Sequence, residues 1–416
     1  MITHIMNTML SRRFSRIRFR FTRVDPGAMQ ARAFGLYVHV PFCTQFCSYC
    51  PFYKVKYRKQ LKQAYLQALF KELELRQPEG ECSWVYLGGG TPNLLTPAEV
   101  ASILSRLRNS VKLREVGMEG NPNLFTPEYL EGVREAGVEK VSMGVETFSE
   151  HALAMVNRHK CEKDHVAKAV GKARELGMSV NVDMLLGLPG QDRELCLSDV
   201  ATLSEMGPSQ ITIYPFLTIR GVEATPSMDD HEMFRTIEEA GHILGPKGYV
   251  RENVWTFRRT ETNAIYDSSG AELVNDYLGF GPTAFSRVGM TQVVNPALEL
   301  YLKMMGEGAW RAFRCDLDEG SAAWRSFAHE LYNLEVDETA IGRLPRGVRL
   351  VLAFLRLTGH VRGSHVTGKG RYAVHSLTRA VVESLPFPIQ NPDVVVNWAD
   401  YDSALASERS DSSPGR

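Results

Sequence analysis

The feature that most constrains the fold is an alternation across residues 35–217, in which short apolar runs are followed by longer amphipathic segments. Such a pattern is typical of strand–helix units that build a parallel sheet. Six strands are predicted, at residues 36–40, 84–87, 115–119, 140–145, 179–185 and 210–215. Helices are predicted between them, at residues 59–75, 97–107, 127–136, 163–176 and 192–206. The chain is therefore expected to be an α/β protein.

The predicted strand–helix units also suggest the shape of the sheet. Right-handed crossovers place the carboxyl ends of parallel strands on one rim, where a β/α barrel builds its site. Six units are two fewer than the eight of a closed barrel. The sequence therefore predicts a partial (β/α)6 barrel similar to a TIM barrel, with a lateral gap for a large ligand.

Outside this region the sequence divides into further segments. Residues 1–33 hold seven arginines and one acid, and are predicted to be a disordered basic arm, although an organelle transit peptide would look similar. Residues 34–220 would form the barrel, and 221–320 an accessory segment covering it, with helices at 229–244 and 296–305. Residues 321–390 would form a small C-terminal α+β module, with a hairpin at 363–373. The polar tail, 391–416, is predicted to be disordered.

The composition excludes several functional classes. The 48 basic residues balance 48 acidic ones, so no net charge draws the chain to nucleic acid or an anionic membrane. The apolar runs are much shorter than the roughly 20 residues that cross a bilayer. Three of the seven cysteines fall within eight residues, which indicates metal ligation in a reducing compartment. A cytoplasmic location is expected, or an organelle if the basic arm is a transit peptide.

Three cysteines follow the first predicted strand in the sequence CTQFCSYC, residues 43–50. At this spacing Cys43, Cys47 and Cys50 can ligate three irons of a [4Fe-4S] cluster from one loop, which leaves the fourth iron without a protein ligand. A small ligand can then bind that iron directly. Zinc is the alternative, but it favours four closed ligands, and His39 is too near the strand to complete such a set.

Glycine-rich and acidic motifs follow the later strands. The glycines of LGGGTP, residues 87–92, would let backbone amides approach a ligand, or would simply form a tight turn. Glu119 and Glu146 end the third and fourth strands, where a carboxylate can bind ribose or adenine or can simply be solvated. Asp183 lies in an apolar strand and needs a partner, for which Arg158 is the predicted candidate.

Together these motifs resemble the radical S-adenosylmethionine (SAM) superfamily, and within it the oxygen-independent coproporphyrinogen III oxidase-like, or HemN-like, family. The resemblance covers residues 36–286. It rests on YVHVPFC (37–43), the cysteine loop, GGGTP (88–92), EGNP (119–122), VSMGVETF (141–148), GLPGQ (187–191) and DYLGFG (276–281). In this superfamily an electron from the cluster splits bound SAM and releases a 5'-deoxyadenosyl radical.

The resemblance implies roles for individual residues, which fall into three groups. The cluster ligands would be Cys43, Cys47 and Cys50. The SAM molecule bound to the cluster would contact Tyr37, Gly89 and Glu119, with Phe285 lining the same site. A second SAM molecule, which members of the family can hold, would contact Tyr49, Gly90, Thr91, Glu146, Arg158 and Asp183.

Departures from the family pattern bear on the reaction. Coproporphyrinogen oxidases have a further cysteine where this chain has Phe52, and usually Gln where it has Glu146. The haem-chaperone (HemW) branch resembles HNxxYW where residues 262–267 read TNAIYD. Enzymes that methylate or cyclopropanate carbon have cluster loops similar to CSYCPFY, residues 47–53. These comparisons favour methyl or methylene transfer to an sp2 carbon, with oxidative decarboxylation of coproporphyrinogen III and haem carriage as alternatives.

The resemblance also implies partners. A small-molecule substrate is expected, of the aromatic, polyene or tetrapyrrole class, together with a reductant such as flavodoxin or ferredoxin. Neither nucleic acid nor a membrane is expected to bind. The aromatic runs at residues 214–216 and 255–257 would either face a flat ligand or belong to the core.

Overall fold

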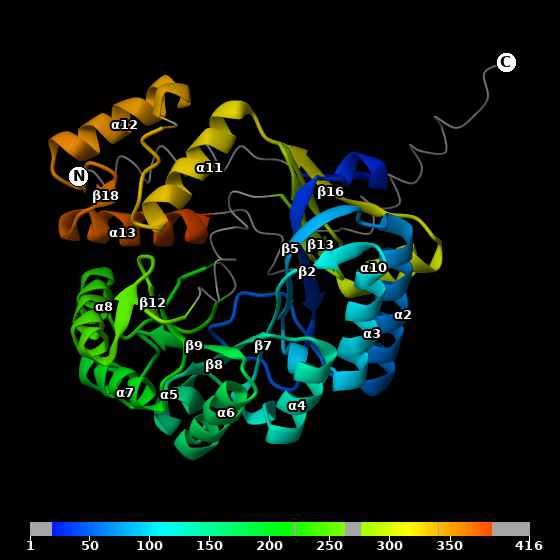
Figure 1. The fold of residues 1–416 in the computed structure, drawn as a ribbon, viewed down its shortest axis with the longest axis horizontal. Coiled ribbons are helices and arrows are strands. Elements are labelled where there is room, and N and C mark those ends of the chain that lie inside the picture. Colours follow the sequence, from blue (N-terminus) through cyan, green and yellow to red (C-terminus); the bar gives the residue numbers. More distant parts are fainter. Residues whose placement is uncertain (1–18, 220–221, 263–275, 340, 385–416) are drawn as a thin grey trace.

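The computed structural model describes residues 19–219, 222–262, 276–339 and 341–384. Fourteen strands of these residues form one sheet, and its centre holds the six predicted strands, all parallel (Figure 1). They are β2 (Ala33–Val40), β5 (Gly80–Gly89), β7 (Val116–Gly120), β8 (Lys140–Glu146), β9 (Ser179–Leu186) and β10 (Gln210–Pro215). The order of these strands in the sheet follows the chain, so the prediction of a partial barrel is confirmed. A short strand, β6 (Val111–Leu113), pairs with the start of β5.

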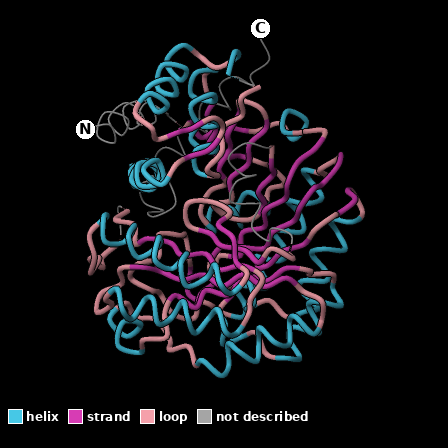
Figure 2. The backbone as a smooth tube through the Cα atoms, turned by 60° about the vertical axis from the view of Figure 1, so that its left-hand side comes forward, coloured by secondary structure: helices cyan, strands magenta, loops and turns pink. Residues whose placement is uncertain are grey.

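Helices between these strands lie on the outer side of the sheet (Figure 2). They are α2 (Lys59–Arg76), α3 (Pro97–Arg108), α4 (Pro127–Ala136), the short α5 (Glu150–Met155), α6 (Lys163–Glu175) and α7 (Arg193–Met206). Local sequence sets their ends. Thr96 and Glu99 form a capping box at the start of α3, and Gly137, in a left-handed conformation, ends α4.

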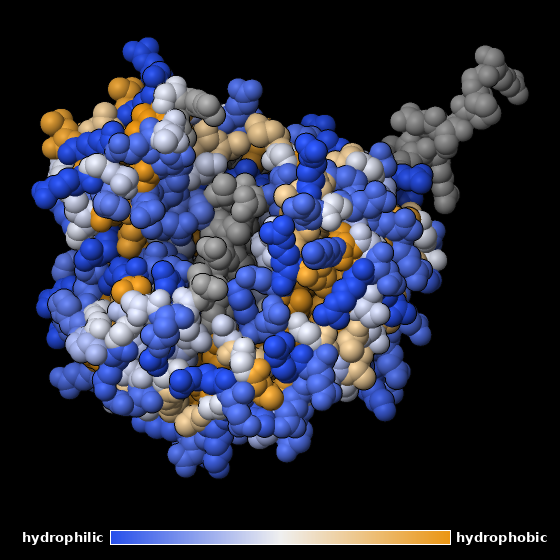
Figure 3. Space-filling model, viewed as in Figure 1, coloured by the Kyte–Doolittle hydropathy of each residue, from blue (hydrophilic) through white to orange (hydrophobic). Residues whose placement is uncertain are grey.

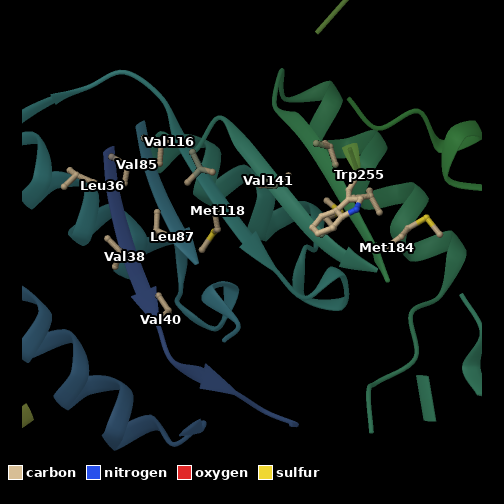
Figure 4. Close-up of a cluster of buried hydrophobic side chains, with 14 of the residues drawn as sticks. Leu36, Val38, Val40, Val85, Leu87, Val116, Met118, Val141, Met184 and Trp255 are labelled. Carbon is tan, nitrogen blue, oxygen red and sulfur yellow. The ribbon is translucent and has the colours of Figure 1, made fainter. Parts of the chain in front are cut away.

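The core lies between the parallel strands and these helices. Leu36, Val38 and Val40 of β2 are fully buried, as is Leu87 of β5 (Figure 4). Full burial of one such side chain stabilises the fold by about 1.5–3 kcal/mol. The parallel strands are therefore held rigidly, and so are the loops that leave their carboxyl ends.

Antiparallel and parallel strands extend the sheet at both edges. Beyond β10 lie β12 (Thr256–Arg259) and β11 (Tyr249–Arg251), with α8 (Asp230–Leu244) beside them. Beyond β2 lie β13 (Tyr277–Phe280), β14 (Phe285–Val288), β15 (Thr291–Val294) and β16 (Arg311–Asp316), with α10 (Leu298–Gly306) packed on α2. The segment 221–320 was expected to cover the barrel. Its described strands instead extend the sheet, because the edges of β2 and β10 present unpaired backbone groups.

The described part of the basic arm is ordered, so the prediction of disorder is wrong there. β1 (Arg20–Arg23) pairs with β16, and the 3-10 turn η1 (Pro26–Met29) follows. Phe19 and Phe21 alternate with arginines, which is the period of a strand with one apolar face. The Phe21 ring packs on Phe313 at 5.0 Å between centroids. In the described residues, β1 and β11 form the two ends of the open sheet.

The C-terminal module contains α11 (Glu319–Tyr332), α12 (Arg346–Leu357), a hairpin of β17 (Val361–Arg362) and β18 (His365–Val366), and α13 (Gly368–Ser384). It lies over the α8 and β12 edge of the barrel (Figure 1), and apolar side chains reach the surface over α12 (Figure 3). The hairpin is shorter than the predicted 363–373, because the residues from Gly368 onward form α13. The Thr367 hydroxyl accepts a hydrogen bond from the Gly370 N–H and so caps the start of that helix. The predicted tail lies outside the described residues.

None of the helices in the described residues combines the length and the apolar character that a membrane span requires.

Candidate functional site

The cysteine loop leaves the carboxyl end of β2. Cys43 ends the short strand β3 (Phe42–Cys43), which pairs in parallel with β4 (Val55–Lys56). The N–H of Val55 donates to Pro41 O at 2.7 Å and that of Tyr57 donates to Cys43 O at 2.9 Å, so the two ends of the loop are tied together. Cys43, Cys47 and Cys50 are all free thiols.

The segment after α5 holds the middle of the same loop. The Asn157 side chain donates to Phe46 O at 2.9 Å and accepts from the Gln45 amide at 2.7 Å, while the Ser48 N–H donates to Val156 O at 3.0 Å. Asn157 has a φ of 52°, a conformation that asparagine tolerates better than most residues. Sequence reasoning assigned it no role, although an asparagine beside Arg158 was a usable signal.

The chemistry of the three thiols fits an iron–sulfur cluster. Burial raises the pKa of Cys43 to about 11 and raises that of Cys50. Cys47 adds to both shifts, and Cys50 adds to that of Cys43. Thiolates in such a place need a bound cation to stabilise them. Within the described ranges, no three His, Cys, Asp or Glu side chains converge on one metal ion. A cubane instead gives each cysteine its own iron, which suits a loop of this spacing.

The end of β5 and the loop that follows it, residues 88–92 (the glycine loop), pack directly on the cysteine loop. A Cβ added at Gly90 would lie 3.0 Å from the Cys43 sulfur and 2.7 Å from Phe42 O. One at Gly88 would lie 2.8 Å from the Tyr37 ring. The Thr91 hydroxyl donates to the Cys43 sulfur at 3.4 Å. A side chain at position 90 would therefore push the two loops apart.

Glu119, at the end of β7, joins this group. Its carboxylate accepts hydrogen bonds from the Gly89 N–H at 2.6 Å and from the Tyr86 hydroxyl at 3.2 Å. Tyr37 lies beside it on β2 and is hydrogen-bonded to His39 at 3.0 Å. The structure thus brings together Tyr37, Gly89 and Glu119, three residues predicted to contact the first SAM.

Arg158 is the centre of a second cluster. Its guanidinium donates to the Tyr49 hydroxyl at 2.8 Å, to the Cys47 sulfur at 3.6 Å and to Gly144 O, and it lies 3.3 Å from the Glu146 carboxylate. Glu146 has a φ of 65° and lies at a bulge where the pairing of β8 with β9 shifts register. Such bulges redirect a side chain near functional sites. Burial raises the pKa of Glu146, which Arg158 opposes.

The partner predicted for Asp183 is wrong. Its carboxylate accepts from the Ser142 hydroxyl at 2.5 Å and from the Asn181 amide at 2.8 Å, whereas Arg158 is taken by Glu146. Ser142 on β8 is paired in register with Asn181, which lies two residues before Asp183 on the same face of β9. Strand pairing therefore supplies the Ser142 hydroxyl, and the alternation along β9 supplies the Asn181 amide. Burial raises the pKa of Asp183 to about 7, and the nearby Glu146 adds to this shift.

The aromatic runs of β10 and β12 are largely core. Phe216, Trp255 and Phe257 are almost completely buried. Tyr214 is the exception, because it is half-buried and its pKa is raised by burial and by the neighbouring Asp183. Phe285 lies on β14, with β13 between it and β2. Residues 263–267, compared with the haem-chaperone motif, lie outside the described residues.

The chain is similar to several known proteins. Residues 37–197 match the family model of the Radical SAM superfamily. The chain is 26% identical over 324 residues to the oxygen-independent coproporphyrinogen III oxidase of Escherichia coli K12, an alignment covering 71% of this chain and 68% of the relative. It is 27% identical over 294 residues to the heme chaperone HemW of Bacillus subtilis 168, covering 65% and 76%. The solved structure of HemN from Escherichia coli has a TM-score of 0.72 at 23% identity, covering 88% of this chain and 95% of that one.

Residues 37–197 therefore form a Radical SAM domain, as the sequence predicted. The chain is also similar both to coproporphyrinogen III oxidases and to HemW chaperones. A Radical SAM domain implies a [4Fe-4S] cluster and SAM as cofactors. The roles of the individual residues and the number of SAM molecules remain predictions.

Proposed function

We propose that this protein binds a [4Fe-4S] cluster through Cys43, Cys47 and Cys50, cleaves SAM reductively, and uses the radical to remove a hydrogen atom from a tetrapyrrole. The observation that carries the proposal is the contact between the cysteine and glycine loops beside the Glu119 carboxylate. The tetrapyrrole class is supported by two relatives, one named for coproporphyrinogen III and the other for heme.

Different residues of the site would bind the cluster and position SAM. The cluster, when bound, supplies the electron that splits the sulfonium of SAM. The Glu119 carboxylate, which accepts from Gly89 and Tyr86, lies at the strand end where it would bind ribose hydroxyls. Gly88 and Gly90 have no side chain, so the backbone after β5 can lie close to Tyr37 and to Cys43. The protein therefore positions SAM and keeps water from the radical.

The test is anaerobic reconstitution with iron and sulfide, followed by dithionite and SAM. We expect 5'-deoxyadenosine, formed faster when coproporphyrinogen III or haem is added. Cys47→Ala should abolish both the brown absorbance of the cluster and SAM cleavage. Cys315→Ala, which removes a buried thiol of β16, is the matched control and should preserve both. A Cys47→Ala protein that retained either property would refute the proposal.

Transfer of a methyl or methylene group is the second candidate. The cluster of Tyr49, Glu146 and Arg158 favours it, because these side chains form a polar site separate from Glu119 and could hold a second SAM. This reaction produces S-adenosylhomocysteine as well as 5'-deoxyadenosine. Decarboxylation of coproporphyrinogen III would instead release carbon dioxide, and a haem carrier would bind haem with little 5'-deoxyadenosine. A product assay with a haem titration separates the three.

A further inference from the structure

The outer surface of the cysteine loop carries exposed apolar side chains. Phe46 is 41% exposed, Phe52 is 54% exposed, and Met155, at the end of α5, is 52% exposed. Phe46 directly precedes Cys47, and Phe52 follows Cys50 by two residues. Large apolar side chains gathered on a surface mark an interaction site more often than scattered ones do.

Lys54 contacts two residues of the same loop. Its amine lies 5.9 Å from the centre of the Phe46 ring and donates to the backbone oxygen of Phe52 at 3.3 Å. Met155 precedes Val156, whose carbonyl oxygen accepts from the Ser48 N–H. We call the surface formed by Phe46, Phe52, Lys54, Lys56 and Met155 the loop face.

The two lysines of the loop face form no ion pair with any described residue. Residues 26–71, which include the whole cysteine loop, contain no Asp or Glu. The Lys54 amine donates to Cys50 O at 2.7 Å and the Lys56 amine donates to Thr44 O, and both acceptors are neutral. Lys56 is also paired in register with Cys43, so the charge lies beside the cluster ligands.

We infer that the loop face is the docking surface for a small acidic protein that carries one electron to the cluster. This inference rests on the proposed function, because SAM cleavage requires a reduced cluster. The carrier loses one electron and the cluster gains it, and no bond forms or breaks. Exposed rings next to Cys47 and Cys50 would bring the carrier close to the irons, and the lysines would attract its acidic surface.

The experiment measures how fast the reconstituted cluster is reduced, from the bleaching of its absorbance. Reduced acidic flavodoxin is the protein donor and dithionite is the small donor. The variants are Phe52→Ser and Lys56→Glu. Leu357→Ser, at an 86% exposed position of α12, is the control for the first. Lys369→Glu is the control for the second, because Lys369 is also exposed and also donates to a carbonyl, that of Thr358.

We expect each loop-face variant to slow reduction by flavodoxin roughly 10-fold and to slow reduction by dithionite, a small anion, far less. The controls should match the unmodified protein with both donors, and added salt should slow the flavodoxin reaction more than the dithionite reaction. Equal slowing with both donors would show that the residues act on the cluster itself and would overturn the inference. Unchanged flavodoxin rates in both variants would overturn it too.

Failure of the proposed function gives a different result. A cluster that flavodoxin reduces normally but that never yields 5'-deoxyadenosine from SAM would refute the proposed function alone. The slowing in Phe52→Ser and Lys56→Glu would still be measurable, because bleaching does not require SAM cleavage.

Discussion

The backbone N–H of Gly89 donates a 2.6 Å hydrogen bond to the carboxylate of Glu119 and so joins the ends of β5 and β7 beside the cysteine loop. A hydrogen bond to a charged acceptor is stronger than one between neutral groups. The bond therefore holds the glycine loop in place beside Cys43, where SAM is proposed to bind.

Replacing Glu119 by Gln separates the structural role of this carboxylate from its proposed role in SAM binding. The amide oxygen of Gln can still accept from Gly89, so we expect the unfolding free energy to change by less than about 1.5 kcal/mol. SAM binding should weaken at least about 10-fold, because a charged acceptor for ribose hydroxyls is lost. Equilibrium binding of SAM to the reconstituted protein measures this. Wild-type affinity in Glu119→Gln would leave the carboxylate with a structural role only.

Removing Arg158 should be strongly destabilising. Its side chain and that of Glu146 are only 15% and 13% exposed, so Arg158→Ala leaves a buried carboxylate without its cation. We expect a loss of about 3–5 kcal/mol in unfolding free energy, measured by urea denaturation. Adding Glu146→Gln to Arg158→Ala should restore part of that loss. Additive losses in the double variant would mean that the two side chains do not form a coupled pair.

Asp183 should make stability depend on pH. Burial raises its pKa from an ordinary 3.8 to about 7, so between these values the folded protein binds a proton that the unfolded chain releases. Its contribution to the unfolding free energy is therefore greatest at acidic pH, falls as pH rises toward 7 and is constant above that. Relative to Asp183→Asn, the wild type should lose up to roughly 1.4 kcal/mol per pH unit across this window. Urea titrations at several pH values measure it, and parallel curves for the two proteins would contradict it.

His375 should hold the C-terminal module to the barrel. This fully buried ring on α13 accepts from the Trp255 indole N–H at 3.0 Å and lies 3.2 Å from the Asp230 carboxylate. His375→Leu leaves the indole N–H unpaired, and we expect a loss of about 1–3 kcal/mol with a change in tryptophan fluorescence. Ser376→Ala, which removes only a hydroxyl donor to Asp230, should cost less. An equal loss in both variants would argue against a special role for the ring.

The N-terminal strand should be required for stability. A chain that begins at Met29 lacks β1 and exposes the edge of β16, and it loses the ring contact of Phe21 with Phe313. We expect a lower melting temperature and a tendency to associate through the exposed edge, because unpaired strands recruit one another. Phe21→Ser in the full chain should reproduce a smaller loss, of about 1 kcal/mol. Identical melting of the shortened and full chains would show that β1 contributes nothing.

The sequence predicted the barrel because the signals that define its strands and helices lie in short segments of the chain. Apolar runs, capping residues such as Thr96, and glycines such as Gly137 specify where strands and helices begin and end. The cysteine spacing is local too, since all three thiols lie in one loop. For the same reason the glycine loop, Glu119 and Glu146 could be assigned to strand ends before any contact was known.

Relations between distant segments were decided only by the tertiary structure. The partner of Asp183 is Ser142 because β8 and β9 pair in that register, and the bulge at Glu146 turns its carboxylate toward Arg158 instead. Residues 20–23 of the basic arm form β1 because they pair with the edge of β16, which lies almost 300 residues later in the chain. Local sequence thus determined the elements and the cluster loop. Long-range strand pairing determined which side chains meet, since that depends on register and burial that no short segment contains.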